Sequence, residues 1–177
     1  MFDREVVVLD QKTTYAPIAA REDAGTLDDE YNRRALHAIV RRIRDEHVAG
    51  HLVLVDSLHA THVVRAGVLS TSSFTDIDRT LHDLGAVIVV LRISEDTIRR
   101  RALVGRRGSG FYEYAMKFGA TEEERVRYFA REQLRILDLL EAHSCLPYVV
   151  LDGEQPADSL QPLFRQTVRL HLTHRVS

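Results

Sequence analysis

Hydrophobic residues gather into four short runs along this chain, and amphipathic stretches lie between the runs. The runs are rich in Val, Ile and Leu, which is typical of buried strands, and they cover residues 5–10, 51–56, 86–93 and 147–152. Successive runs are far enough apart for helical crossovers, so the pattern predicts parallel strands. Because polar residues scarcely interrupt the runs, it also predicts that both faces of the sheet are covered.

Apolar residues at three- and four-residue spacing predict helices between these strands. The expected helices are 28–47, 94–104, 121–143 and 156–172, with shorter ones at 58–66 and 75–84. In the 121–143 helix we expect inward side chains at Val126, Phe129, Leu134, Leu137 and Leu140. Irregular structure is expected in the polar stretch 11–27, in STSS at 70–73 and in GRRGSG at 105–110.

The chain has 177 residues and shows no internal repeat, low-complexity tract or linker rich in Pro, Gly or Ser. We therefore expect one domain, residues 1–177. Its fold class is expected to be α/β, with a three-layer αβα arrangement around a mainly parallel sheet.

Charge and cysteine content exclude several classes of protein. The formal net charge of −2 gives no electrostatic reason to expect a nucleic-acid partner. A single cysteine, Cys145, excludes a disulfide framework and a zinc site built from several cysteines. No apolar run approaches the roughly 18 residues of a membrane span, and MFDREVVV is too short and too acidic for a signal peptide. We expect a cytoplasmic protein without a membrane partner.

Arginine dominates the basic residues, since only Lys12 and Lys117 among the 24 are lysines. Guanidinium groups bind phosphate oxygens in pairs, which favours phosphate chemistry, although a coding bias toward arginine produces the same surplus. The nine glycines never form G-x-x-x-x-G-K-[ST]. Gln11-Lys12-Thr13-Thr14 is similar to the end of that motif but lacks the glycine-rich span, so we do not interpret it as a phosphate-binding loop.

Three of the four runs end on an aspartate, namely Asp10, Asp56 and Asp152. Ligands of open parallel sheets bind beyond the carboxyl ends of the strands. Asp56 suits a magnesium-bound water or a general base near a phosphate, but aspartates at strand ends also cap the helix or turn that follows. Capping is favoured for Asp10 and Asp152, and both interpretations stay open for Asp56.

Five arginines lie within nine residues: Arg99, Arg100, Arg101, Arg106 and Arg107. A helix that opens into a glycine-containing loop is where a lid that closes over phosphates is built. Salt bridges to Glu95, Asp96 and the glutamates of 122–124 are the alternative role for some of these side chains. We expect Arg101 and one of Arg106 and Arg107 to be functional.

Two further patterns carry weaker signals. Tyr31 and Arg34 are three residues apart on the predicted 28–47 helix, so together they are able to stack a base and hold its phosphate. The pairs His59-x-x-His62 and His171-x-x-His174 have the spacing of metal ligands, but no third ligand is recognisable, and we expect core or surface histidines. No Gly-x-Ser-x-Gly pattern supports covalent catalysis.

Taken in order, residues of about 5 to 170 resemble a P-loop nucleotide kinase of the thymidylate-kinase-like group. Arg33-Arg34-Ala35-Leu36-His37 is similar to the family's Asp-Arg-Ala-Gln-His motif. That likeness implies that Arg34 holds an acceptor monophosphate and that Tyr31 stacks the acceptor base. Val55-Asp56-Ser57-Leu58 resembles the family's strand ending in Asp-Arg-Tyr, keeping Asp56 without the Arg and Tyr.

The second half of the chain resembles the family's lid and last strand. AVIVVLRISEDTIRRRALVGRR is similar to the strand, capped helix and lid arginines, which implies an adenine-side role for Arg101 and lid roles for Arg106 and Arg107. The lid is expected at approximately 105–120. The strand that ends at Asp152-Gly153 looks like the one whose loop contacts adenine. ATP and Mg²⁺, the latter held by Asp56 through water, are the cofactors that the resemblance implies.

The family's first strand, its phosphate-binding loop and the helix after it have no counterpart here. Two interpretations stay open: the chain starts at an internal methionine of a longer kinase, or it is a degenerate relative. The expected function is ATP-dependent phosphoryl transfer to a nucleotide or other small acceptor, impaired in this chain. The alternative is a non-catalytic nucleotide- or partner-binding protein, with a homodimer as an expected assembly. A distant third is an unrelated α/β hydrolase that uses Asp56 and histidines.

Overall fold

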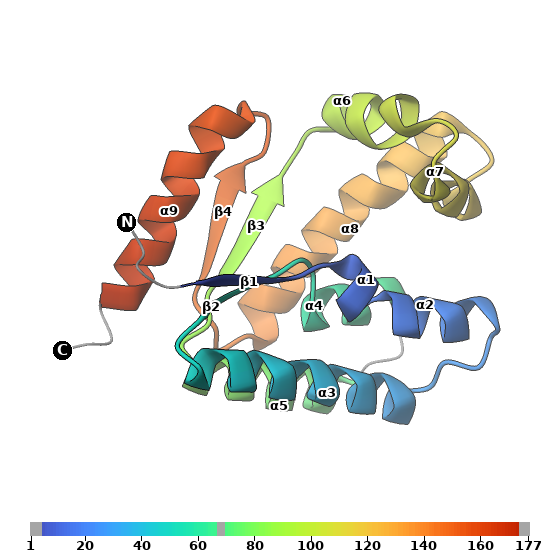
Figure 1. Ribbon diagram of the computed structural model, residues 1–177. Coiled ribbons are helices and arrows are strands. Elements are labelled where there is room, and N and C mark those ends of the chain that lie inside the picture. The colour runs from blue at the N-terminus through green and yellow to red at the C-terminus, as the bar shows by residue number, and fades with distance from the viewer. Residues whose placement is uncertain (1–4, 67–69, 174–177) are drawn as a thin grey trace. The chain divides into compact units, whose positions relative to one another are not determined.

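The computed structural model describes residues 5–66 and 70–173, and it combines helices with four short strands in two separate parallel pairs (Figure 1). Contacts within the chain group into two compact units. The N-terminal unit holds the described residues up to Ala86 together with Leu139–Pro147. The C-terminal unit holds Val87–Asp138 and the described residues from Tyr148 onward. The expectation of a single three-layer domain stays a prediction.

The N-terminal unit is built on the parallel pair of β1 (Val6–Leu9) and β2 (Leu52–Val55), in which Val6 lies opposite Leu52 and Leu9 opposite Val55. This pairing confirms the two predicted strands and their parallel direction. The long helix α3 (Asp29–Val48) connects them, and the Asp28 carboxylate caps it by accepting a hydrogen bond from the Tyr31 amide. The apolar side chains of Leu36, Val40 and Ile43 on α3 are all buried.

The expectation of irregular structure after β1 is wrong. Residues 11–23 form two helices, α1 (Gln11–Thr14) and α2 (Ala16–Asp23). The physical reason is local: Asp10 caps α1 through the Thr13 amide, and Pro17 lies in the first turn of α2, where its missing N–H costs nothing. Ile18 on α2 is fully buried and fixes this segment to the core.

The segment after β2 begins with two short helical turns, α4 (His59–Thr61) and the π-helical η1 (His62–Ala66). The helix α5 (Thr71–Asp83) then starts four residues earlier than expected, so the predicted loop at 70–73 is wrong. Ser70 is the N-cap, and its Oγ accepts a hydrogen bond from the Ser73 amide. Phe74 and Ile77 of α5 are fully buried in this unit.

The C-terminal unit contains the second parallel pair, β3 (Ile88–Arg92) and β4 (Tyr148–Asp152), with Arg92 directly opposite Asp152. Ser94 caps the helical segment that follows β3, because its Oγ accepts a hydrogen bond from the Thr97 amide. That segment runs through α6 (Glu95–Thr97), the π-helical η2 (Ile98–Leu103) and the 3₁₀ turn η3 (Val104–Arg106).

The predicted lid at 105–120 is largely helical in the structure. It contains α7 (Gly110–Ala115) and the 3₁₀ turn η4 (Met116–Phe118). The expected loop at 105–110 is corrected at both of its ends, because η3 reaches Arg106 and α7 begins at Gly110. The helix α8 (Glu122–His143) follows, and the Thr121 hydroxyl accepts from the Glu124 amide at its start. The last helix is α9 (Ala157–Thr173).

Burial confirms part of the predicted core and corrects the rest. Val126 and Leu140 of α8 are buried as expected, and Val126 packs with Ile98, Leu103 and Ala115. Leu134 is wrong as an inward position, because it is 48% exposed. The strands also carry exposed apolar side chains, with Val8 at 61% and Leu91 at 54%, so complete covering of both strand faces is not observed for them. No helix among the described residues is both long and apolar enough to cross a bilayer.

Candidate functional site

Two of the three strand-end aspartates serve as caps. Asp10 Oδ1 accepts hydrogen bonds from the amide and the hydroxyl of Thr13, at 3.1 and 3.2 Å. Asp152 Oδ1 accepts from the Glu154 amide at 3.0 Å, and its Oδ2 accepts from Gln155 Nε2 at 3.0 Å. This confirms the capping role of Asp10. It also shows that Asp152, assigned to nucleotide binding by resemblance, already uses both carboxylate oxygens in the turn after β4.

Asp56 differs from the other two because its carboxylate makes no hydrogen bond or ion pair with any described residue. Its backbone is nevertheless fixed: the amide donates to the Leu9 carbonyl at 2.9 Å, and its carbonyl accepts from the Thr14 hydroxyl at 3.1 Å. Ser57 then has a φ of 54°, in the left-handed region that non-glycine residues seldom adopt. The turn after β2 therefore presents one exposed, uncommitted carboxylate.

Among the described residues, Asp56 offers a single carboxylate as a metal ligand at the end of β2. No group of three or more His, Cys, Asp or Glu side chains able to hold a metal ion occurs among residues 5–66 and 70–173. Mg²⁺ in phosphate-transfer sites is commonly held by one or two carboxylates, with waters and substrate phosphates completing the octahedron. Asp56 fits that role as a single ligand and does not fit a site made entirely by protein side chains.

The predicted acceptor residues on α3 are close to each other and have different surroundings. The Tyr31 ring lies under the Arg21 guanidinium, 4.1 Å from its centroid, and its hydroxyl donates to the Pro17 carbonyl at 3.4 Å. One face of the ring is therefore already occupied. Arg34 is exposed, and its Nε is 3.6 Å from the Glu30 carboxylate. Glu30 bonds more closely to Arg33, which lowers the pKa of Glu30 below its ordinary value.

Sequence reasoning missed a buried polar cluster beside these residues. His62 Nδ1 and Asn32 Oδ1 are 2.9 Å apart, and both residues are fully buried. The Tyr15 ring meets the His62 ring edge-on at 5.6 Å. Asn32 Nδ2 is buried and has no hydrogen-bond partner in the described part of the chain. The histidine spacing was the one available signal, and nothing in the sequence marks Asn32, since it requires knowing which face of α3 turns inward.

The other histidine of the 59/62 pair is also in the core, as predicted. His59 Nε2 lies 2.9 Å from Asp78 Oδ1, and Ser144 Oγ donates to the same oxygen at 2.8 Å. The amide of Cys145 donates to Asp78 Oδ2 at 2.5 Å. Burial raises the pKa of Asp78, but these hydrogen bonds outweigh it and bring the pKa to about 2. The pair 171/174 includes a residue outside the described part of the chain.

The arginine-rich segment 99–107 is in the C-terminal unit, and carboxylates pair with two of its members. Arg99 Nε lies 3.2 Å from Glu122 Oε1, and a second nitrogen of Arg99 lies 3.5 Å from Asp96. Arg107 lies 3.7 Å from the other oxygen of Glu122. Salt bridging, the alternative that the sequence left open, is therefore the role of Arg99 and in part that of Arg107.

The remaining members of the segment have no carboxylate within salt-bridge distance among the described residues. Arg100 donates to the Thr97 hydroxyl at 3.1 Å, and the Arg106 guanidinium lies 5.3 Å from the centre of the Phe111 ring. Arg101 Nη1 donates to the Gly153 carbonyl at 2.9 Å. This contact brings together Arg101, Gly153 and the adjacent Asp152, the three residues that the resemblance assigns to the nucleotide.

Glu154 connects the same two loops a second time. Its Oε1 accepts from the Ser94 amide at 2.5 Å, and its Oε2 accepts from the Thr97 hydroxyl. These bonds, that from the Ser94 amide first, lower the pKa of Glu154 to about 2. The loop after β3 and the loop after β4 are thus held together at the carboxyl ends of their strands.

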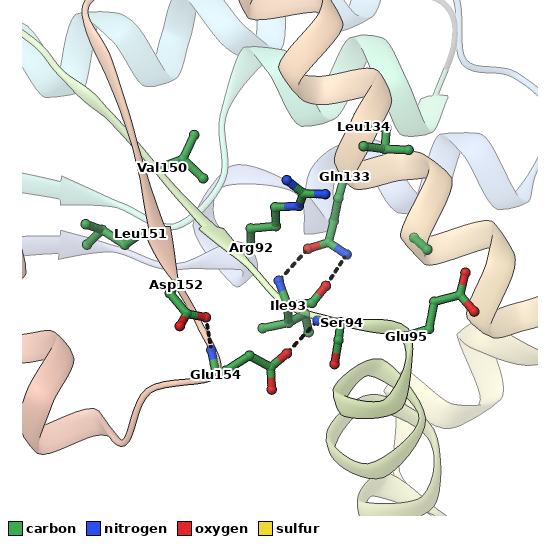
Figure 2. Close-up of a pocket in the computed structure, with 11 residues that line it drawn as sticks. Arg92, Ile93, Ser94, Glu95, Gln133, Leu134, Val150, Leu151, Asp152 and Glu154 are labelled. Atoms are coloured by element: carbon green, nitrogen blue, oxygen red, sulfur yellow. Dashed lines mark hydrogen bonds between the residues drawn. The ribbon is translucent and has the colours of Figure 1, made fainter.

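A pocket of about 590 Å³ opens at this place, lined by the ends of β3 and β4 and by α8 (Figure 2). The Gln133 amide bridges the Ile93 backbone, accepting from its N–H at 3.0 Å and donating to its carbonyl at 3.2 Å. Figure 2 shows these two bonds together with the bond from the Ser94 amide to Glu154. The lining of the pocket therefore combines polar groups held by hydrogen bonds with apolar side chains such as Val150 and Leu134.

The predicted site residues fall into two groups. Tyr31, Arg34 and Asp56 lie in the N-terminal unit, whereas Arg101, Arg106, Arg107, Asp152 and Gly153 lie in the C-terminal unit. No protein-family model matches the chain, and no curated protein matches it.

Proposed function

We propose that this chain is a nucleotide- or small-molecule-kinase-like protein that binds ATP through its C-terminal unit. The observation that carries the proposal is the 2.9 Å hydrogen bond from Arg101 to the carbonyl of Gly153, whose chain neighbours Asp152 and Glu154 line the 590 Å³ pocket. It joins an arginine-rich helix to the loop after a parallel strand, and parallel sheets bind ligands beyond that end of their strands. The segment that holds Arg106 and Arg107 then supplies positive charge for the phosphates.

The other predicted residues take the acceptor side of the reaction in this proposal. Arg34 binds an acceptor phosphate, and the exposed face of Tyr31 contacts the acceptor's ring. Asp56 holds Mg²⁺ through water, a role that its uncommitted carboxylate supports. The acceptor is a nucleotide or another small molecule.

The proposal includes the three-layer arrangement of the family that the sequence resembles, and the parallel direction within each strand pair is consistent with it. In the family that the sequence resembles, the strand before the phosphate-binding loop lies inside the sheet, not at its edge. Here β1 pairs with β2 and β3 with β4, and no described strand connects the pairs. Since the 177 residues also lack the glycine-rich loop, the proposal includes impaired catalysis, with turnover below the order of 1–100 per second of ordinary kinases.

Calorimetric titration with Mg²⁺–ATP tests the proposal. We expect binding that weakens about tenfold in Arg101→Ala and in Arg106→Ala, since each removes a charge-assisted contact to phosphate or adenine. Arg99→Ala is the matched control, because it removes the same charge from the same segment but its guanidinium is already held by Glu122 and Asp96. Absence of Mg²⁺–ATP binding, or equal effects of all three changes, contradicts the proposal.

A specific observation favours a second candidate function, a non-catalytic protein that binds a partner, including a second copy of itself. Val8, Leu91 and Val150 are apolar strand residues with exposed side chains, and solvent-facing apolar positions of this kind are commonly covered by a partner. Sedimentation velocity on the full chain separates the two candidates. A dimer that does not bind Mg²⁺–ATP supports the second and contradicts the first.

A further inference from the structure

A second pocket of about 330 Å³ lies in the C-terminal unit. Its lining comes from the end of η4, the loop before α8 and the first four turns of α8, and it consists of Phe118, Gly119, Glu124, Tyr128, Arg131 and Arg135. None of these residues is a candidate site residue of the sequence analysis, and none is used in the proposed function. We call it the Phe118 pocket.

The loop that forms one wall of the Phe118 pocket is held rigidly from both sides. Glu124 Oε2 accepts hydrogen bonds from the amides of Ala120 and Thr121, at 2.7 and 3.1 Å. The buried Arg125 donates to the carbonyls of Gly119 and Ala120, at 3.0 and 2.8 Å. A Cβ on Gly119 would lie 2.6 Å from the Glu124 Cβ, so only glycine permits this close approach. The wall is therefore preorganised rather than adaptable.

A second wall is aromatic. The rings of Phe118 and Tyr128 stack with their centroids 4.1 Å apart and an angle of 12° between their planes. Phe129 supports this pair from the side, since its ring is 5.8 Å from Phe118 and 5.3 Å from Tyr128. Planar rings fixed in this way form a surface on which a flat heterocycle stacks, for about 1–3 kcal/mol in nucleic-acid complexes.

The third wall carries two arginines that no carboxylate neutralises in the described part of the chain. Arg131 and Arg135 are one turn apart on α8, which places their Cβ atoms about 5–6 Å from each other on the same face. Arg131 uses its Nε to donate to the Arg127 carbonyl at 3.3 Å, and Arg135 makes no hydrogen bond or ion pair with a described residue. Two neighbouring like charges destabilise a helix slightly, so an anion placed between them is stabilised.

The Glu124 carboxylate limits which ligands are able to bind in the Phe118 pocket. Both amide contacts of Glu124 go to Oε2, so Oε1 remains as an acceptor without a hydrogen-bond donor among the described residues. The ligand must therefore offer a hydroxyl or amino donor to Glu124 in addition to an anion for the arginines. One carboxylate against two guanidiniums leaves the lining with a net positive charge, which suits a singly phosphorylated molecule.

We propose that the Phe118 pocket binds a nucleoside monophosphate. The base stacks on the Phe118–Tyr128 pair, the phosphate lies between Arg131 and Arg135, and Glu124 Oε1 accepts a hydrogen bond from a ribose hydroxyl or an amino group of the base. This site shares no residue with the proposed ATP site, so either proposal stands without the other.

Calorimetry on the full chain with adenosine 5′-monophosphate and with ribose 5-phosphate tests this site. We expect the ribose phosphate to bind about tenfold more weakly, because it lacks the stacking ring. Arg131→Ala and Arg135→Ala should each weaken binding of both compounds about tenfold, by removing charge-assisted hydrogen bonds. Phe118→Leu should abolish the difference between the two compounds while leaving binding of the ribose phosphate unchanged.

Arg127→Ala is the matched control, because Arg127 is one turn from Arg131 on the same helix but does not line the pocket. Its affinity for adenosine monophosphate should equal that of the unchanged chain, as should that of the Arg101→Ala/Arg106→Ala double variant. The proposal is overturned if the two compounds bind equally, if Arg127→Ala and Arg131→Ala lose the same affinity, or if the double variant loses affinity. Absence of binding overturns it as well. If Phe118→Leu loses its helical circular dichroism, the exposed arginine variants decide the result.

Discussion

Two groups of arginines in the C-terminal unit look alike in composition and differ in what surrounds them. In the segment 99–107, where arginines are densest, Glu122 holds Arg99 and Arg107, and Gly153 accepts from Arg101. On α8, Arg131 and Arg135 are spaced one turn apart and have no carboxylate partner among the described residues. The spaced pair lines a pocket, whereas most of the dense group is committed to the protein itself.

The difference shows that the density of arginines along a sequence is a weak guide to anion binding. A guanidinium that already has a carboxylate partner gains little from a phosphate, because the exchange breaks one ion pair to form another. Anion binding is better indicated by a cation that has no carboxylate partner and lies beside a concave, rigid surface. Arg125 is a further arginine of α8 that is not available to an anion. It is buried and donates to the backbone carbonyls that shape the Phe118 pocket.

The largest expected effect is the loss of Arg125. Arg125→Met should lower the free energy of unfolding by about 2–3 kcal/mol, because the Gly119 and Ala120 carbonyls lose their donors in a buried place. Urea denaturation measures this loss. Arg127→Ala, an exposed change on the same helix, should alter the free energy of unfolding by less than about 0.5 kcal/mol. Equal stabilities of the two variants would show that Arg125 does not fix the wall of the pocket.

A second prediction concerns Asp78, a buried carboxylate of the N-terminal unit with several hydrogen-bond partners. Its pKa of about 2 lies below the ordinary 3.8, a difference that corresponds to about 2 kcal/mol of stability. Because the folded-state pKa is depressed, this stability is present above pH of about 3.8 and is lost as the pH falls through about 2.

Acid titration of the unfolding free energy checks this pH window. The unchanged chain should lose stability across it, whereas Asp78→Asn should start lower and show a flatter profile there. Identical profiles would mean that Asp78 contributes nothing to the pH dependence of folding.

The sequence predicted the regular elements better than it predicted the site. The four strands and the long helices α3 and α8 follow from hydrophobic periodicity, which is encoded within a few residues. The helices at 11–23 were not predicted because their stretch of sequence is polar. An N-cap and one buried side chain, Ile18, are enough to stabilise helices there.

The partners of the charged residues could not be predicted for a different reason. The Arg99–Glu122 and Glu154–Ser94 contacts join residues that the chain brings together from separate segments. Sequence spacing suggested Glu122 as one of several acids but could not say which arginines it would hold. Arg131 and Arg135 were likewise not predicted as site residues. Their lack of acidic partners is visible only once α8 and the loop before it are folded together.

The smallest expected effect sharpens the comparison between the two arginine groups. Glu122→Gln removes the carboxylate that lies 3.2 Å from Arg99 and 3.7 Å from Arg107. Freed guanidiniums should strengthen Mg²⁺–ATP binding about two- to fivefold at low salt, the range expected of exposed ion pairs. Calorimetry on this variant checks the gain, and affinity for adenosine monophosphate at the Phe118 pocket should stay the same. A gain at the Phe118 pocket would mean that general charge, not partner release, controls both sites.

The most direct test is a titration of the full chain with adenosine monophosphate, in which nuclear magnetic resonance follows the backbone amides. It shows whether arginines without carboxylate partners beside a rigid pocket bind the anion. We predict that the largest shifts occur at Gly119, Ala120 and Thr121 and around Arg131, and that equal concentrations of inorganic phosphate leave the amides of 119–121 less perturbed. Shifts confined to residues 99–107, or identical responses to the two anions, would contradict the account.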